Sequence, residues 1–230
     1  MKKTIAVLAA SVAVSASLLG ASPVAAKSSP PSCFSDCQGV NLSGDTYKNM
    51  NLSDGNFSGT TLNGTSFEES TLTGANFQGA SGYGTSFKGA TLTNANLTKV
   101  NFWITNGVNF KSANMTGANM TGANTPLASF KKATLNNANF TNATASKARF
   151  KKATATDANF TGASLNYSKF RKAKLTGANF TNADLTRASF KGANLTDADF
   201  TGATVSKTKF AGAKFNNTTC PDGTVTNTGC

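Results

Sequence analysis

The sequence predicts an all-β solenoid with four faces, and three observations lead to this fold class. Apolar residues recur every five positions, a period that fits neither an α-helix nor a flat strand, so the chain must turn every five residues. Gly or Asn often follows the apolar residue by two positions, and both tolerate a left-handed corner. Finally, the apolar residue types segregate with a period of twenty, as four faces per coil require.

The five-residue unit is clearest between residues 141 and 202. We call its apolar residue the centre, the residue two positions later the corner, and the residue two positions earlier the small position, because Ala usually occupies it. The centres of this stretch are Ala145, Phe150, Ala155, Phe160, Leu165, Phe170, Leu175, Phe180, Leu185, Phe190, Leu195 and Phe200.

Every fourth centre belongs to one column along the solenoid. One column is aromatic throughout: Tyr47, Phe67, Phe87, Phe110, Phe130, Phe150, Phe170, Phe190 and Phe210. The opposite column contains Phe57, Phe77, Leu97, Met120, Phe140, Phe160, Phe180, Phe200 and Cys220. Two mostly aliphatic columns, Leu52 to Phe215 and Leu42 to Val205, lie between them. We therefore expect about nine coils, roughly 43 Å long at about 4.8 Å per coil.

Units such as Ala178-Asn179-Phe180-Thr181-Asn182, and A-N-L-T-D at 193–197, resemble the pentapeptide-repeat family. The resemblance extends over residues 38–219. It implies a right-handed quadrilateral β-helix with four units per coil, in which the centres and small positions point inward.

The first 26 residues have the pattern of a secretory signal peptide. Lys2 and Lys3 precede an apolar run from Ile5 to Leu19, and Val24-Ala25-Ala26 supplies a small-residue cleavage site. The apolar run is short for a membrane span, and no lipobox cysteine follows it. The sequence therefore predicts a secreted or cell-envelope protein without a membrane span after cleavage.

Cysteines occur only near the two ends of the repeat region. Residues 27–37 form a flexible lead-in and N-terminal cap, residues 38–219 the solenoid, and residues 220–230 a C-terminal cap. A disulfide needs Cα atoms within about 7 Å, so the length of the rod permits only the pairs Cys33–Cys37 and Cys220–Cys230. The same distance excludes a four-cysteine zinc site. We interpret both loops as caps on the apolar ends of the solenoid.

The five-residue period is interrupted once, between Phe102 and Phe110, where Thr105, Asn106 and Gly107 are surplus. The role of this insertion stays open. Nearby aromatic and apolar residues occupy outward positions on one face, which suggests a patch for a protein partner or a glycan. The patch contains Tyr83, Trp103, Ile104, Pro126 and Leu127.

Cations accumulate on the face of the Tyr47 column. After residue 100 this face has no acid, although stacked like charges repel by up to about 1 kcal/mol per pair. A solubilising surface explains the pattern, and so does a track for a linear polyanion such as a cell-wall polymer, an acidic polysaccharide or nucleic acid. The candidate binding residues are Lys111, Lys131, Lys132, Arg149, Lys151, Lys152, Lys169, Arg171, Lys172 and Lys191; Lys147, Arg187 and Lys207 extend the face over the adjoining corner.

The opposite face carries a column of Thr residues beside a column of Asn. Such flat arrays are similar to those of ice-binding solenoids, but Thr is simply a favoured strand residue, so ice binding is not expected. The chain has no histidine, and its ten acids are scattered. Acid–base and metal chemistry need converging groups, so we expect no enzyme, no cofactor and no metal site.

Some pentapeptide-repeat proteins mimic DNA and bind type II topoisomerases through an acidic surface inside the cell. The present chain is basic, with a formal net charge of +12, and it carries an export signal. Topoisomerase binding is therefore not expected. The sequence favours a secreted, non-catalytic binding or structural protein whose ligand and oligomeric state stay open.

Overall fold

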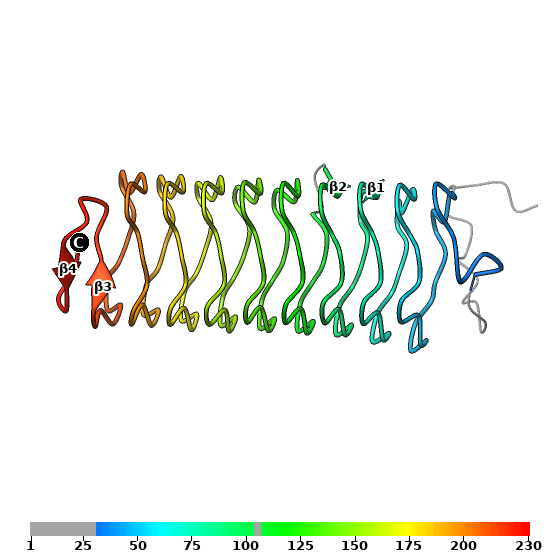
Figure 1. Cartoon of the computed structure of the whole chain (residues 1–230), viewed down its shortest axis with the longest axis horizontal. Helices are drawn as coiled ribbons and strands as arrows, with labels where there is room; N and C mark the ends of the chain where they lie inside the picture. Colours follow the sequence, from blue (N-terminus) through cyan, green and yellow to red (C-terminus); the bar gives the residue numbers. More distant parts are fainter. Residues whose placement is uncertain (1–30, 104–106) are drawn as a thin grey trace, which may run out of the picture.

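The computed structural model describes residues 31–103 and 107–230, whose backbone forms a rod of stacked coils (Figure 1). The first described residues lie at one end of the rod and the C-terminus at the opposite end. The predicted signal peptide (1–26), the first residues of the lead-in, Ile104, and Thr105 and Asn106 of the insertion lie outside the described part of the chain.

Pairing between neighbouring coils has an offset of 20 residues. Parallel bridges join residues 36 and 56 at the N-terminal end and residues 199 and 219 at the C-terminal end. Only the coil with the insertion differs, because Ser86 pairs with Asn109 and Asn101 with Asn124. Five residues per unit and 20 per coil confirm the prediction of four units per coil.

The same hydrogen bonds recur in each unit. The amide of Phe170 donates to the carbonyl of Ser189 on the next coil at 2.8 Å, and the amide of Ser189 donates back to the carbonyl of Ser168 at 3.0 Å. The amide of Ala173 donates to the carbonyl of Phe170 at 2.9 Å and closes the turn within the unit. These backbone groups of the unit are thus paired within the rod, as burial demands.

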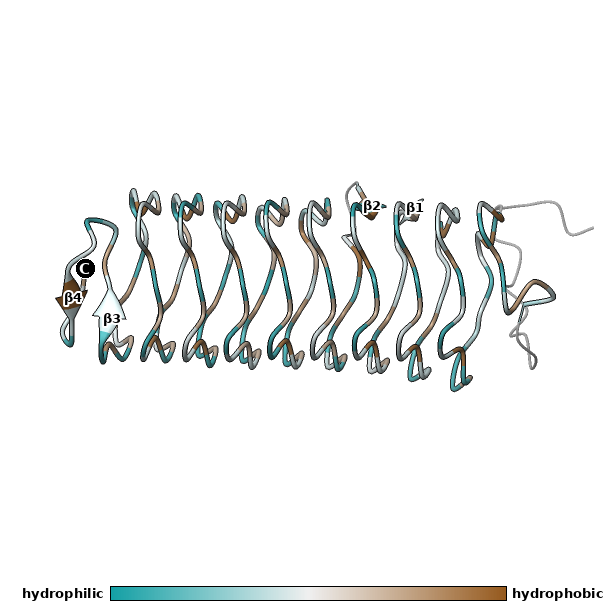
Figure 2. Ribbon diagram, viewed as in Figure 1, coloured by the Kyte–Doolittle hydropathy of each residue, from teal (hydrophilic) through white to brown (hydrophobic). Residues whose placement is uncertain are grey.

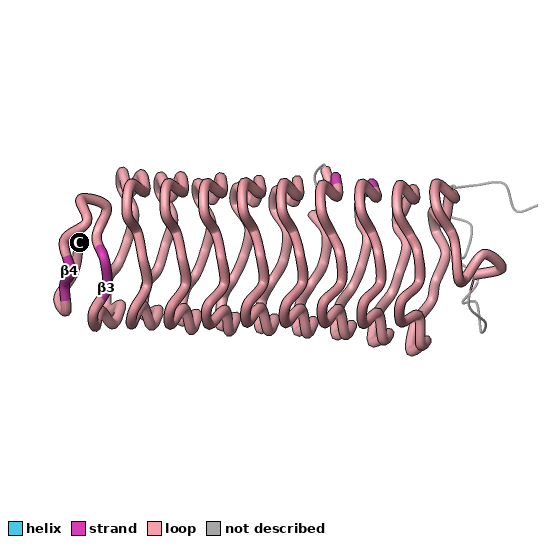
Figure 3. The backbone as a smooth tube through the Cα atoms, viewed as in Figure 1, coloured by secondary structure: helices cyan, strands magenta, loops and turns pink. Residues whose placement is uncertain are grey.

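Only two pairs of regular strands form within the described residues. Strand β1 (Ser81–Gly82) pairs in parallel with β2 (Asn101–Phe102), and β3 (Thr218–Thr219) pairs antiparallel with β4 (Val225–Thr226). The rest of the rod consists of turns and single bridges (Figure 3). A unit of five residues that includes a corner is too short to contain a longer strand.

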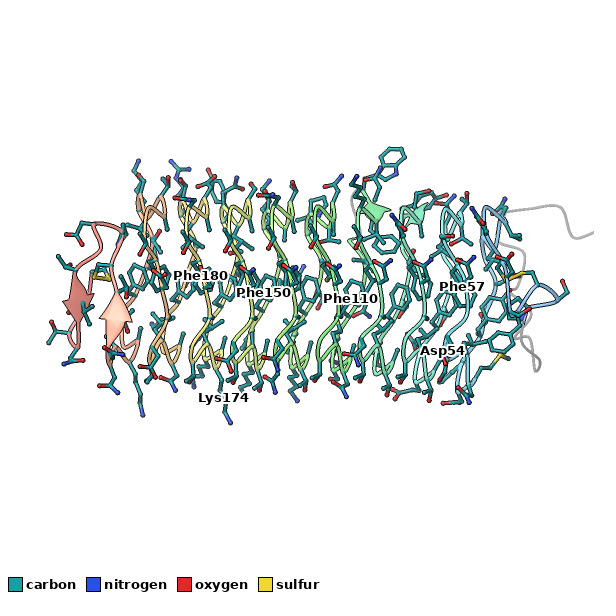
Figure 4. The ribbon with its side chains drawn as sticks, viewed as in Figure 1. Asp54, Phe57, Phe110, Phe150, Lys174 and Phe180 are labelled. Atoms are coloured by element: carbon teal, nitrogen blue, oxygen red, sulfur yellow. A yellow bond between two sulfur atoms is a disulfide. The ribbon has the colours of Figure 1, made fainter. Side chains whose placement is uncertain are left out.

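The centres form a continuous aromatic and aliphatic core. Hydrophobic and hydrophilic residues alternate along the coils (Figure 2). Rings of one column stack face to face: the centroids of Phe150 and Phe170 are 4.5 Å apart with an interplanar angle of 5°, and those of Phe160 and Phe180 are 4.9 Å apart. Rings of the two columns meet edge to face, as Phe160 and Phe170 do at 5.8 Å and 83°. In Figure 4, Phe57, Phe110, Phe150 and Phe180 lie inside the coils, whereas Lys174 points outward.

The column between Leu42 and Val205 is the thinnest part of the core. A Cβ atom on Gly82 would lie 2.8 Å from the carbonyl carbon of Leu62, so the close approach of two coils requires glycine there. Ala145 is buried in the same column. The hydroxyl of Thr125 is buried and has no hydrogen-bond partner among the described residues.

An Asn or Asp directly before the centre stabilises the turn that follows. The side-chain oxygen of Asn159 accepts hydrogen bonds from the amide (3.0 Å) and hydroxyl (2.6 Å) of Thr161, and Asp199 accepts the same pair from Thr201. Such side-chain bonds to the residue two positions later favour tight turns. The N-x-T triplets therefore have a structural role, and many Thr hydroxyls of the predicted Thr column are already engaged.

Both predicted disulfides form. The Cα atoms of Cys33 and Cys37 are 4.8 Å apart, and those of Cys220 and Cys230 are 5.3 Å apart. Cys37 is buried, and its amide donates to the carbonyl of Asn56 at 2.7 Å, so coil pairing already includes the end of the predicted N-terminal cap.

Loss of a stacked ring should destabilise the rod far more than loss of an outward side chain. Phe170 is fully buried between two parallel rings, so Phe170→Ala should cost about 3–5 kcal/mol. Thr181 is outward and partly exposed, and Thr181→Ala should cost about 1 kcal/mol or less. Denaturant unfolding of the two variants compares these values. Equal midpoints would contradict the assignment of the core.

Asp199 should add an acid-sensitive contribution to stability. Burial raises its pKa, but hydrogen bonds from Thr201 and Thr181 outweigh burial and hold the pKa below its ordinary value. A lowered pKa in the folded state stabilises the fold above the ordinary carboxyl value of about 3.9, and this stabilisation disappears as the pH falls through the lowered pKa.

The variant Asp199→Asn isolates this effect, because Asn at the matching position 159 makes the same bonds without titrating. The difference in unfolding midpoint between pH 7 and acid pH should be smaller for the variant than for the parent protein. An identical acid shift in both proteins would rule out Asp199 as a contributor.

Candidate functional site

The cations predicted to form one face lie on consecutive coils. Lys151, Arg171 and Lys191 directly follow stacked centres of the Tyr47 column and are exposed, and Lys111 and Lys131 are partly exposed. The pairing confirms their register: the amide of Lys172 donates to the carbonyl of Lys191 at 3.0 Å, and the other coils repeat this bond. Adjacent cations of the column are thus separated by about one coil, roughly 4.8 Å at the backbone.

Further cations occupy corner positions with left-handed backbone. Lys132, Lys152 and Lys172 have φ of +61°, +59° and +56°, and Lys147 and Arg187 on the adjoining corner have +61° and +60°. Residues other than Gly, Asn and Asp pay roughly 1–2 kcal/mol for this conformation. Gly and Asn occupy many other corners of the rod. At these corners either residue would adopt the left-handed backbone at a lower free-energy cost than Lys or Arg.

Two adjoining surface pockets, of about 680 Å³ and 450 Å³, border this face. They share Leu127 and Arg149 and therefore form one hollow along the rod, which we call the groove. Its walls are the corner column from Leu127 to Arg187 on one side and the cation column on the other. The cations that line it are Lys111, Lys131, Lys147, Arg149, Lys169, Arg171, Arg187, Lys191 and Lys209.

No acid lines the groove in the described part of the chain. None of its cations lies within ion-pair distance of a described carboxylate; the ion pair of the Tyr47 face is Lys88 to Glu68 at 3.9 Å, outside the groove. Six of the ten predicted binding residues line the groove, while Lys132, Lys151, Lys152 and Lys172 do not.

Tyr167 is an exposed aromatic residue at the edge of the groove that the sequence prediction missed. It occupies a corner position with φ of +59°, and Arg187 on the next coil packs over its ring with the guanidinium carbon 5.3 Å from the ring centroid. Nη1 of Arg187 donates to the Tyr167 hydroxyl at 2.6 Å. A bulky ring at a position that otherwise favours Gly, Asn or Asp is the sequence signal that could have revealed it.

The predicted aromatic patch is more loosely assembled. Tyr83 and Trp103 are 53% and 48% exposed, Pro126 is partly exposed, and Ile104 lies outside the described residues. Pairing of β1 with β2 places Tyr83 and Trp103 one coil apart. Within the described residues their two rings do not stack on each other. Leu127 borders the groove instead.

The insertion leaves the core in phase, because Phe87 and Phe110 stack at 5.1 Å across it. Its last residue, Gly107, lies against the backbone of Leu127: a Cβ there would be 2.6 Å from the Leu127 carbonyl carbon. Gly107 thus adjoins the N-terminal end of the groove.

The described residues contain no cluster of three or more His, Cys, Asp or Glu side chains that could hold a metal ion. Burial, and then a hydrogen bond to Asp45, raise the pKa of Tyr47 at the N-terminal end of the core, where the ring is part of the aromatic stack.

Within the described ranges no helix has the length and apolar character to cross a membrane.

The regular four-unit coils define a pentapeptide-repeat solenoid. The family model "Pentapeptide repeats" matches in eight copies over residues 51–81, 71–103, 104–124, 127–162, 146–182, 156–192 and 178–217. The chain therefore belongs to the pentapeptide-repeat family, whose fold is the right-handed quadrilateral β-helix. Comparison with curated proteins gives no match.

Solved structures of this family resemble the chain. HetL, involved in heterocyst differentiation regulation in the cyanobacterium Nostoc sp. strain PCC 7120, is 26% identical with a TM-score of 0.51, covering 84% of this chain and 94% of HetL. The plasmid-mediated fluoroquinolone resistance protein QnrB1 is 17% identical with a TM-score of 0.47, over 75% of this chain and 94% of QnrB1. A pentapeptide-repeat protein of the Arabidopsis thaliana thylakoid lumen is 29% identical with a TM-score of 0.26, over 59% of this chain and 68% of that protein.

Proposed function

We propose that this pentapeptide-repeat protein is a secreted, non-catalytic binding protein whose basic face holds a linear extracellular polyanion. The observation that carries the proposal is the unbroken series of exposed or partly exposed cations at the position after the centre, from Lys111 to Lys191, on consecutive coils. A linear polyanion matches such a series, since each coil adds one cation at the same spacing.

Two energetic costs support a role beyond solubility. Repulsion between stacked cations and the left-handed backbone at basic corners both oppose this arrangement. Solubility alone does not require the charges to gather at one place, whereas the groove concentrates one sign in a concave site. Export, inferred from residues 1–26, favours a cell-envelope polymer as the partner. Topoisomerase binding is not expected, because the chain is basic and its export is inferred.

We also propose that the rod has about nine coils and that the disulfide loops at its ends act as caps. The ends of a solenoid expose an apolar cross-section. Phe34, inside the loop closed by Cys33 and Cys37, packs against the core. Phe215 packs against the core at the other end, where the amide of Cys220 donates to the carbonyl of Thr224.

Polyanion binding through this face should depend steeply on salt, because bound phosphates or carboxylates release counterions. Retention on immobilised poly(glycerol phosphate), single-stranded DNA and a carboxylated polysaccharide would be measured at low and high salt. Reversal of three face cations (Lys131→Glu, Lys151→Glu and Lys191→Glu) should reduce retention at least about tenfold and leave thermal unfolding nearly unchanged, since these side chains point outward.

The matched control reverses three cations on other faces (Lys99→Glu, Lys174→Glu and Lys214→Glu), with the same change in net charge. It should retain most of the binding. The absence of retention on all three polymers at low salt would refute the proposal. Retention that survives high salt and is lost in Trp103→Ala would instead assign binding to the aromatic patch of Tyr83 and Trp103.

Reduction of the disulfides should fray the ends before the middle. Hydrogen exchange with and without reductant should show earlier loss of protection in the coils next to Cys37 and Cys220 than around Phe150, because each coil is supported only by its neighbours. Uniform loss of protection along the rod would argue against a capping role.

A further inference from the structure

The groove is long enough to hold several repeats of an extended polymer. Its floor residues are joined by consecutive bridges from Asn109 through Ser129, Arg149, Lys169 and Ser189 to Lys209. Five coil spacings of about 4.8 Å give a length of about 24 Å. The groove therefore follows the rod axis, along the corner between two faces.

The lining of the groove suits an extended chain that lies along it. The larger pocket, of about 680 Å³, is lined from Leu127 to Lys209, over four coil spacings or about 19 Å. Cations line both walls and the floor of this pocket, so an extended strand would have its anionic groups against them.

The density of positive charge selects for a polymer with closely spaced anions. Nine cations line about 24 Å of groove without an intervening acid. A polymer with an anion on every short repeat uses most of these cations, while a polysaccharide with one carboxylate per disaccharide leaves many of them unpaired. Three of the nine are Arg, whose planar donors match phosphate oxygens in pairs.

Arg187 is held in place before any ligand arrives. Nη1 donates to the hydroxyl of Tyr167 and the guanidinium carbon lies 5.3 Å from the ring centroid, so these contacts orient Arg187 and leave its other donors for an anion. Pre-orientation lowers the entropy cost of each hydrogen bond that Arg makes.

The same contact argues against recognition of nucleobases. Proteins that bind single-stranded nucleic acid offer successive aromatic platforms on which bases stack. Tyr167 is the one aromatic residue that lines the described groove, and Arg187 packs against its ring. The other apolar wall residue, Leu127, has no ring.

We infer that the groove binds a single strand of linear polyol phosphate, a polymer of phosphodiester groups joined by short polyols without bases. The phosphates would be held by Arg149, Lys169, Arg171 and Arg187. This inference rests on the proposed function and specifies both its site and its ligand class.

The test measures the affinity of the full chain for fluorescent poly(glycerol phosphate) at low salt. The groove variant carries Arg149→Glu, Lys169→Glu and Arg171→Glu. The control variant carries Lys99→Glu, Lys174→Glu and Lys214→Glu, which change the net charge equally but lie outside the basic face. A corner variant with Lys132→Glu, Lys152→Glu and Lys172→Glu compares the groove with the far corner of the same face, and Glu69 occupies an equivalent left-handed corner, so its substitutions suit their backbone.

The groove variant should lose at least about tenfold in affinity, and the control variant less than about threefold. If the groove variant does not fold, the neutral variant with Arg149→Gln, Lys169→Gln and Arg171→Gln replaces it, with an expected loss in the same direction. Equal losses in groove and corner variants would place binding on the face as a whole: the groove would be refuted while the proposed function stands. An equal loss in the control variant would refute both.

Two further ligands of matched charge test the polymer class. Oligo(dT) and a carboxylated glycan should bind more weakly than poly(glycerol phosphate). Tighter binding of either would overturn the assignment of polyol phosphate. No binding of any of the three at low salt would refute the proposed function together with the groove.

Discussion

The fixed register between coils is the constraint on which the rest of the structure depends. Every unit hydrogen-bonds to units 20 residues away, so a residue type repeated at that spacing becomes a column. The inward columns become continuous stacks, in which Phe150, Phe170 and Phe190 lie face to face. The outward columns follow the same register, so cations that recur every 20 residues lie next to each other on neighbouring coils.

Core and surface therefore respond to the register in opposite ways. Aromatic rings gain about 0.5–1.5 kcal/mol per favourable pair beyond their burial, whereas cations in register repel. The stacked core holds the cations of the face close together, and the repulsion makes the face a strong local source of positive potential. A bound polyanion would relieve this repulsion, which links the stability of the rod to its proposed ligand.

The periodicity of the sequence was sufficient to predict the columns, the four-unit coil and the disulfide pairs, because each depends on spacing alone. The turns stabilised by Asn159 and Asp199, and the groove with its Arg187–Tyr167 contact, depend on the direction of side chains at the corners. The five-residue pattern placed Tyr167 at a corner but did not reveal that Arg187, 20 residues later, would pack on its ring. The prediction of a basic face was therefore incomplete, because it did not include the groove at the corner that carries Lys147, Tyr167 and Arg187.

Backbone amide shifts of the isotope-labelled protein, recorded while poly(glycerol phosphate) is added at low salt, test the central claim most directly. The account predicts shift changes concentrated on the coils from Asn109 to Lys209, at the corner that carries Lys147, Tyr167 and Arg187, with little change at the Thr column on the opposite face. Changes centred on Tyr83 and Trp103, or spread evenly over all four faces, would contradict it.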